Sequence, residues 1–370
     1  MIPESAGRGI RLSVAIGYPV VPAVSGAALG LAVVQATRPT STLSPTTGAG
    51  DDVQAREPGI PVGLSRVGVS GVEKVVRIHD ELFLARLDCF VDLGHDQKGA
   101  HMSRFDEVVN EAIGEVVLSE SPFRAETLAR HIAELVRARQ RAERAEVTIA
   151  ARYPEHKRAP VSGVQTQEIY TLHGRAVAFE HGTRGTVGVS ATGITACPCA
   201  QELVAARARG RLTEQEFSPA QIERIMESVP VATHNQRGLA TLHIGCVEGC
   251  EVEIEAATLL EIAEASMSSE IYELMKRSDE VEVVEKAHRR PRFVEDCVRE
   301  MLAGVARTFT ELDGASFVWA RQENLETIHQ HNVVAERHGL LSELRAELAS
   351  GAPVAHHTTL EEWLNVGVGN

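Results

Sequence analysis

Cysteine is scarce in this chain, with six among 370 residues. So few thiols in so long a sequence cannot form the dense disulfide framework that stabilises small secreted proteins. We therefore predict a reducing, cytoplasmic setting in which thiols are available for metal binding or catalysis. The six positions are Cys89, Cys197, Cys199, Cys246, Cys250 and Cys297.

Basic side chains are also in short supply. Lys and Arg number 37 against 51 Asp and Glu, which gives a formal net charge of -14. This excess of negative charge opposes binding to nucleic acid or to an anionic membrane surface, so we expect neither as a partner. An anionic small molecule would need a local basic pocket.

Charge is absent altogether from residues 12–37. The run resembles an export signal, but Pro19 and Pro22 interrupt any helix there. A stretch rich in Thr, Pro, Gly and Asp follows, with the composition of a linker. We predict that residues 1–62 form a disordered or unrelated extension to the fold.

The remaining chain shows the periodicity of a mixed fold. Apolar residues alternate through Glu81–Leu93, as expected of a strand, and the element order strand, strand, helix, helix, strand then recurs. Duplication of one α+β unit is therefore expected, over residues 63–160 and 161–336. Residues 337–370 are predicted to be a tail, and Glu270–Glu280 to be helical.

Two thiols surround a proline where a predicted strand ends. Gly193 lets the backbone turn, and Cys197-Pro-Cys199 follows. The sulfurs are too close in sequence for a Cys-x-x-Cys clamp, so one thiolate is expected to serve as metal ligand or nucleophile while the other packs. The alternative is a buried cysteine pair acting as small hydrophobes.

Two other polar clusters are candidate sites. Lys98, His101 and Arg104 gather at the start of a predicted helix, where free amides favour an anion such as phosphate; a solvated loop with scattered cations is the alternative. His329 and His331 would project from one face of an extended segment and could approach one metal ion, although isolated histidines more often have structural roles.

Several motifs together resemble the GTP cyclohydrolases of the type IB and methanopterin-pathway group. The similarity extends from about residue 63 to residue 334. The motifs that carry it are Asp96–Phe105, Thr195–Glu202, Thr233–Arg237, Phe293–Asp296 and Glu326–His331. The resemblance implies an α+β tunnelling fold of two tandem antiparallel-sheet units with helices on one face. It also implies a homotetramer with active sites at subunit junctions.

The resemblance further implies one divalent metal ion per subunit, with Fe²⁺ favoured and Mn²⁺ or Zn²⁺ accepted by the same donors. Cys197 is then the metal-binding or catalytic thiol. Glu270 and a histidine of the pair His329 and His331 complete the metal site. His234 lies beside it and transfers protons.

The substrate implied by the resemblance is GTP. Glu285 would hold the guanine edge, and the triphosphate would bind Lys98, His101, Arg104 and Arg237. Hydrolysis of the imidazole ring would release formate and leave a 7,8-dihydroneopterin phosphate, either the triphosphate or the 2',3'-cyclic phosphate. Two alternatives remain open: a non-catalytic metal- or purine-binding protein of the same fold, and a thiol-dependent nitrile reductase.

Overall fold

The computed structural model groups residues 51–370 as one compact unit. It describes residues 53–78, 81–118, 125–247, 250, 252 and 254–365. Most of the predicted N-terminal extension, residues 1–52, lies outside the described residues. No helix in the described ranges is long and apolar enough to cross a bilayer.

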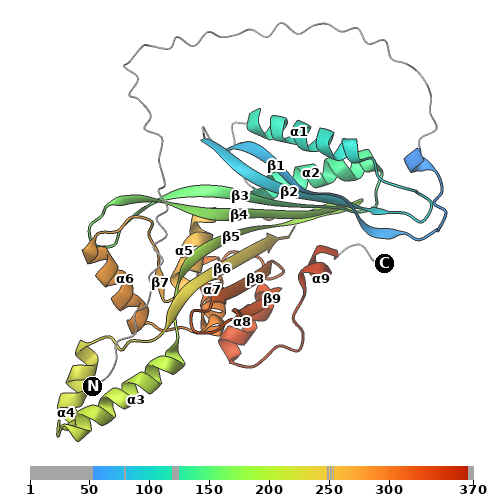
Figure 1. The fold of residues 1–370 in the computed structure, drawn as a ribbon. Coiled ribbons are helices and arrows are strands. Elements are labelled where there is room, and N and C mark those ends of the chain that lie inside the picture. Colours follow the sequence, from blue (N-terminus) through green and yellow to red (C-terminus); the bar gives the residue numbers. More distant parts are fainter. Residues whose placement is uncertain are drawn as a thin grey trace, which may run out of the picture. The chain divides into compact units, whose positions relative to one another are not determined.

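One antiparallel sheet of nine strands organises this unit (Figure 1). Strands adjacent along the path pair in sequence order, β1-β2-β3-β4-β5-β6-β8-β9, while the short β7 pairs with β5. The strands are β1 (Leu64–Ile78), β2 (Glu81–Leu93), β3 (Ala145–Arg158), β4 (Gln165–Phe179), β5 (Gly182–Ala196), β6 (Asn235–Cys246), β7 (Ser269–Glu270), β8 (Phe317–Leu325) and β9 (Val333–Leu340).

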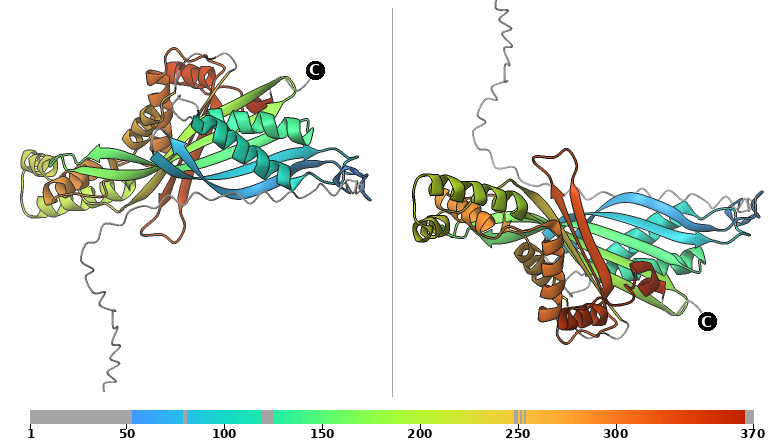
Figure 2. Two further views of the ribbon diagram at one scale, coloured as in Figure 1. Left: turned by 90° about the horizontal axis from the view of Figure 1, so that it is seen from above. Right: turned by 90° about the horizontal axis from the view of Figure 1, so that it is seen from below.

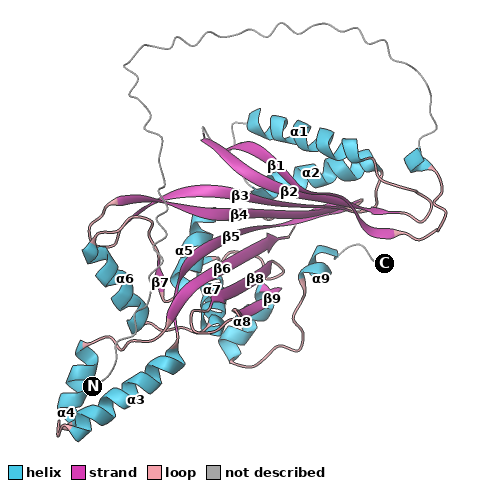
Figure 3. Ribbon diagram, viewed as in Figure 1, coloured by secondary structure: helices cyan, strands magenta, loops and turns pink. Residues whose placement is uncertain are grey.

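Four helices cover one face of the sheet (Figure 3). They are α1 (Met102–Leu118) and α2 (Ala125–Gln140) over the first strands, and α5 (Ala256–Ser266) and α7 (Val294–Thr308) over β5, β6 and β8. The other helices are η1 (Val53–Ala55), α3 (Pro198–Glu214), α4 (Pro219–Ser228), α6 (Arg277–Arg289), α8 (Leu341–Ser350) and α9 (Leu360–Asn365).

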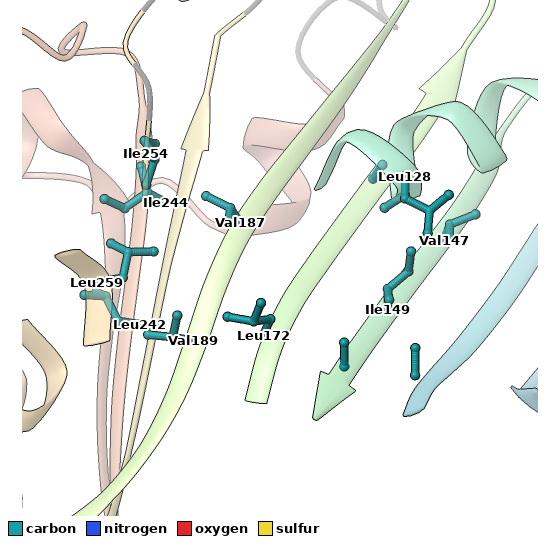
Figure 4. Packing of buried hydrophobic residues seen from close by; sticks show 14 of the residues in the cluster. Leu128, Val147, Ile149, Leu172, Val187, Val189, Leu242, Ile244, Ile254 and Leu259 are labelled. Atoms are coloured by element: carbon teal, nitrogen blue, oxygen red, sulfur yellow. The ribbon is translucent and has the colours of Figure 1, made fainter. Parts of the chain in front are cut away.

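The core lies between this helical layer and the sheet. Alternate residues of each strand point inward, so Ile149 of β3 and Leu242 of β6 are fully buried with Leu128 of α2 and Leu259 of α5 in one continuous cluster (Figure 4). Gly174 of β4 makes the packing possible. A Cβ atom there would lie 2.2 Å from the carbonyl oxygen of Ala125, at the start of α2.

The opposite face of the sheet, which we call the open face, carries polar side chains between its strands. His173 lies 2.8 Å from the Ser190 hydroxyl, and that hydroxyl lies 2.9 Å from the hydroxyl of Thr241. The rings of His173 and His243 are 5.2 Å apart. Burial lowers the pKa of His173 to about 4 and that of His243 well below its ordinary value, so both imidazoles are neutral at pH 7.

The predicted α+β fold, with tandem antiparallel units and helices on one face, is confirmed. The predicted helix over Glu270–Glu280 is wrong. Strand β4 stops pairing with β5 at Ser190, which leaves the end of β5 with a free edge, and β7 fills it by pairing Glu270 with Gly193. Helix α6 begins only at Arg277.

The segment predicted as a tail packs against the rest of the unit. It completes β9, continues through α8 with Leu344 buried, and reaches the open face with α9. There Trp363 is 1% exposed, and its Nε1 donates a 2.9 Å hydrogen bond to the carbonyl oxygen of Ala315. The predicted boundary at residue 160 falls in the turn between β3 and β4, inside the continuous sheet.

We expect the substitution Trp363→Ala to lower the free energy of unfolding by about 3–5 kcal/mol, because it empties a large buried volume and leaves the Ala315 carbonyl without its donor. Guanidinium chloride denaturation followed by circular dichroism measures the change. Val62→Ala, at a side chain that is 63% exposed, is the matched control and should have little effect. Equal, small changes in both variants would contradict a structural role for α9.

Candidate active site

Pairing of β5 with β6 brings two predicted site motifs together. Register places Ala196 opposite Asn235, so the residues that follow and precede them are also adjacent. The amide of Cys197 donates a 3.1 Å hydrogen bond to the carbonyl of His234, and the Thr233 hydroxyl donates to the carbonyl of Cys197 at 2.8 Å. The thiol and the imidazole therefore sit at one end of the sheet although they are distant in sequence.

The two thiols of Cys197-Pro-Cys199 differ in environment. Cys197 is the N-cap residue of α3 and is half-buried, with Pro198 in the first turn of the helix. Cys199 is exposed, because α3 buries none of its residues. The expectation that the second thiol packs is therefore wrong.

The imidazole of His234 is held through one nitrogen. Its Nδ1 lies 3.1 Å from Gln236 Oε1 and 3.8 Å from Glu326 Oε2. The amide nitrogen of Gln236 donates to Glu326 Oε1 at 3.3 Å and to the Thr195 hydroxyl at 3.2 Å, which leaves the amide oxygen facing His234. Both atoms near Nδ1 are therefore hydrogen-bond acceptors. Nδ1 therefore carries the proton, and the Nε2 lone pair is available as a base or a ligand.

Glu326 is a functional residue that the sequence reasoning missed. Its side chain is only 7% exposed, and Oε2 is buried without a hydrogen-bond partner beside the His234 ring. A buried carboxylate next to an imidazole Nδ1 is the usual outer support of a catalytic or metal-binding histidine. Glu326 begins the motif that contains His329 and His331, but its neighbour is the ring of His234, which is far from it in sequence.

Glu270 lies on β7, on the other side of β5 from His234. Its Oε2 accepts a short hydrogen bond from Lys286 Nζ of α6. Burial alone would raise the pKa of Glu270, but the Lys286 hydrogen bond and positive charge outweigh it, and the pKa is lowered. The carboxylate is thus ionised at neutral pH, as a metal ligand must be.

The histidine pair lies away from these groups. His329 and His331 are exposed in the loop between β8 and β9, with their rings stacked at a centroid distance of 5.2 Å. The donor types of the predicted site suit a divalent cation: a thiol, an ionised carboxylate, and imidazoles. Among the residues that the structure describes, however, no group of three or more His, Cys, Asp or Glu side chains could hold a metal ion within one chain.

The predicted phosphate ligands lie at the opposite end of the sheet. The segment after β2 carries Lys98, His101 and Arg104. The last residues of β2 pair with the start of β3, which pairs with the end of β4, and the end of β4 pairs with the start of β5. Cys197 follows the last residue of that strand. The 15 residues of β5, at about 3.3 Å each, separate the two groups by roughly 45 Å.

The other two predicted substrate residues are exposed. Arg237 lies on β6, opposite Ile194 and close to the strand end that carries His234. Glu285 lies on α6, with its side chain 47% exposed and 3.7 Å from Arg289. Within a single chain, therefore, the structure brings Cys197, His234 and Arg237 to one end of the sheet and leaves Lys98, His101 and Arg104 at the other.

Comparison with known proteins identifies the family. A family model described as Type I GTP cyclohydrolase folE2 matches residues 51–335. The chain belongs to this family. A relative named "GTP cyclohydrolase MptA" from Methanococcus maripaludis is 42% identical over 309 residues, covering 80% of this chain and 98% of the relative. One of the same name from Haloarcula marismortui is 41% identical over 304 residues, covering 80% and 97%.

These findings confirm the resemblance to the methanopterin-pathway group. Among solved structures, a uricase from Arthrobacter globiformis is similar with a TM-score of 0.46 and 8% sequence identity, covering 81% of this chain and 98% of the uricase.

Asp279 fixes the position of α6, the helix that carries Glu285 and Lys286. Its carboxylate accepts hydrogen bonds from the amides of Val161 and Ser162 in the β3–β4 turn, at 2.9 and 2.8 Å, and from the Ser162 hydroxyl at 2.6 Å. It also accepts from the amide of Lys276 at 2.8 Å. Burial would raise the pKa of Asp279, but these hydrogen bonds outweigh it, and the pKa is lowered.

We expect Asp279→Ala to accelerate hydrogen exchange at the amides of Val161 and Ser162, because both lose their acceptor. Glu280→Ala, at the exposed neighbouring carboxylate, is the control. A carboxyl group with a lowered pKa stabilises the fold above its ordinary pKa, and that stabilisation is lost only as the pH falls through the lowered value. Protection of both amides in the wild-type protein should therefore persist at about pH 4, near the ordinary pKa of aspartate. Loss of protection at that pH would contradict the assignment.

Proposed function

We propose that this protein is a metal-dependent GTP cyclohydrolase. It hydrolyses the imidazole ring of the guanine in GTP, releases formate, and leaves a 7,8-dihydroneopterin phosphate. The observation that carries the proposal is the β5–β6 register, which joins the backbone of the half-buried Cys197 to that of His234, whose imidazole has a carboxylate beside it, in a chain of the GTP cyclohydrolase family. We expect the enzyme to act in the cytoplasm, because its thiols form no disulfide framework.

A divalent metal ion, ferrous iron in the first instance, would be held by Cys197, Glu270 and one of His329 and His331; because these side chains form no metal-binding group within one described chain, they would have to meet at a junction of subunits. Once bound, it would lower the pKa of a water molecule toward neutrality and so supply a nucleophile for C8 of the purine. The lowered pKa of Glu270 supports this role, because the carboxylate is already ionised; Lys286 now provides the positive charge that a cation would supply.

His234 acts as the proton carrier. Its Nε2 lone pair can accept a proton from the attacking water and return it to a ring nitrogen as the C8–N bond breaks. Glu326 stabilises the positive charge that the imidazole acquires in between. The buried Oε2 atom of Glu326, 3.8 Å from Nδ1 and without a hydrogen-bond partner, is suited to this, since an unsolvated carboxylate interacts strongly with a nearby cation.

Glu285 selects the base. A carboxylate facing guanine accepts hydrogen bonds from N1–H and from the exocyclic amine, whereas adenine would leave it unpaired. Such discrimination requires that Glu285 be shielded from water, and in the single chain its side chain is 47% exposed. A second subunit would provide the shielding.

We propose that the active enzyme is a homotetramer with its sites at subunit junctions. Lys98, His101 and Arg104 lie roughly 45 Å from Cys197 along the sheet, so they can bind the triphosphate of a GTP held at Cys197 only if they come from another subunit. Arg237, on the strand that carries His234, would bind phosphate from the same subunit.

Formate release from GTP tests the function. Protein prepared without oxygen and loaded with iron, manganese or zinc is incubated with GTP, formate is measured enzymatically, and the phosphorus spectrum of the pterin distinguishes the triphosphate from the cyclic phosphate. We expect one formate per GTP consumed. GTP binding without formate for every metal would overturn the proposal and favour a purine-binding protein.

Cys197→Ala should reduce formate production to below about 1% of wild type, since it removes both a ligand and a thiol from the site. Cys250→Ala, at a half-buried cysteine packed against the core far along the chain, is the matched control and should retain activity within about twofold. Equal loss of activity in the two variants would show that the thiol of Cys197 has no special role.

Glu326→Gln should lower kcat by about 10–100-fold with little change in the KM for GTP, because the neutral amide no longer supports the protonated imidazole. Glu323→Gln, on β8 just before Glu326 but paired with Arg321 and Asn332, serves as the control. Steady-state kinetics measures both. A wild-type kcat for Glu326→Gln would remove Glu326 from the mechanism.

A further inference from the structure

Helices α3 and α4 form a hairpin, which we call the arm (residues 198–228), without a hydrophobic core of its own. None of the 17 residues of α3 is buried, and Ile222 is the only buried residue of α4. The arm leaves the sheet after Cys197 and returns before His234, and it projects beyond the ends of the strands (Figures 1 and 2). Isolated helices of this length are marginal in water, so the arm needs a further packing partner.

One side of α3 is suited to such a partner. Successive side chains of an α-helix are rotated by about 100° around its axis. This rotation places four side chains in one stripe that faces away from α4: Leu203, Val204, Arg207 and Arg211. Leu203 is 67% exposed and Val204 is 45% exposed. The two arginines are exposed and form no ion pair with another residue of the described chain, whereas Arg209, on the α4 side, binds Glu223. The outer stripe of α3 therefore consists of two exposed apolar side chains followed by two arginines that have no acidic partner within the described chain.

A stripe of complementary character lies on α6. Val281 and Val284 are 60% and 52% exposed, one turn apart, whereas Val283 on the opposite side of the helix is buried. The exposed carboxylates of Glu280 and Glu282 flank the two valines on either side, and Glu285 continues the stripe. The α6 stripe thus offers apolar contact framed by negative charge.

The two stripes do not meet within one chain. Gln201 at the start of α3 donates to the carbonyl of His288 at the end of α6, and Arg289 donates to the carbonyl of Glu227 in α4. These contacts fix the arm against the end of α6 but leave the valines of α6 and the outer side of α3 exposed. Each stripe is available to another molecule.

We propose that the α3 stripe docks on the α6 stripe of a second copy of this chain, and that the partner's arm docks reciprocally. Reciprocal docking makes the contact two-fold symmetric, so that the assembly closes as a dimer instead of growing into a filament. The valines pack against Leu203 and Val204, and Arg207 and Arg211 approach Glu280 and Glu282. The contact also covers the face of α6 that bears Glu285. This last consequence rests on the proposed function, since it makes the arm a wall of the guanine pocket.

Cross-linking between differently marked chains tests the contact. A chain with Val204→Cys and one with Val284→Cys, carrying tags of different length, are co-expressed and oxidised with diamide; neither chain alone holds both new thiols. We expect a mixed disulfide dimer by gel and peptide mass spectrometry. Val62→Cys, at a side chain 63% exposed, replaces Val284→Cys in the control and should give only the background due to the exposed Cys199.

Charge reversal gives an independent measurement. Arg207→Glu with Arg211→Glu should weaken self-association at least tenfold in sedimentation analysis, and adding Glu280→Arg and Glu282→Arg should restore it. Circular dichroism verifies that the variants are folded, which is expected because every changed side chain is exposed.

Either the absence of a mixed disulfide or unchanged association after charge reversal would overturn the proposal. These outcomes are independent of the proposed function, because neither measurement uses GTP. Failed cross-linking with normal formate release removes only the interface, and cross-linking without formate release removes only the function.

Discussion

The hydrogen-bond register between β5 and β6 is the constraint on which the candidate active site depends. It fixes Ala196 opposite Asn235, so the next residues, Cys197 and His234, are joined by a backbone hydrogen bond. A shift of one residue would turn every side chain of β6 to the other face, which would move Leu242 and Ile244 out of the core and His243 into it. The hydrophobic core therefore enforces the geometry of the site.

The same sheet places the remaining polar groups on three different supports. Glu270 lies on the two-residue strand β7, which pairs with the part of β5 that extends beyond its pairing with β4. Glu326 follows β8, and the histidine pair lies in the loop after it. Gln236 of β6 joins the Glu326 segment to β5, because its amide contacts both Glu326 and Thr195. The sheet thus orients His234, whereas the predicted histidine ligands lie in an exposed loop.

Local periodicity was sufficient to predict most of the fold. Strand β2 begins and ends at the predicted residues, because one face of it is buried and the other is not. Local periodicity could not predict β7, because its two residues are extended only through pairing with the free edge of β5. The edge strand β9 was also missed, because its alternation is weak: most of its residues are partly exposed, and its pairing with β8 defines it.

For the site, the sequence indicated which residues matter but not how they are arranged. Cys197 and His234 were expected side by side and are joined by a backbone hydrogen bond. The distance between Lys98 and Cys197, in contrast, depends on the direction in which β5 runs, which no local pattern encodes. Glu326 was missed for a related reason. Its importance comes from a contact with an imidazole on another strand, and a single glutamate before a His-x-His pair gives no sign of that contact.

The open face has a spectroscopic consequence. The chain contains two tryptophans, and both lie on this face: Trp319, with its ring 4.9 Å from His243, and Trp363 under the guanidinium of Arg184. Because α1, α2, α5 and α7 have none, the intrinsic emission of the protein arises from the side of the sheet that those helices do not cover. Emission thus acts as a built-in optical probe of whatever approaches that surface, and it does not sense changes confined to the helical layer.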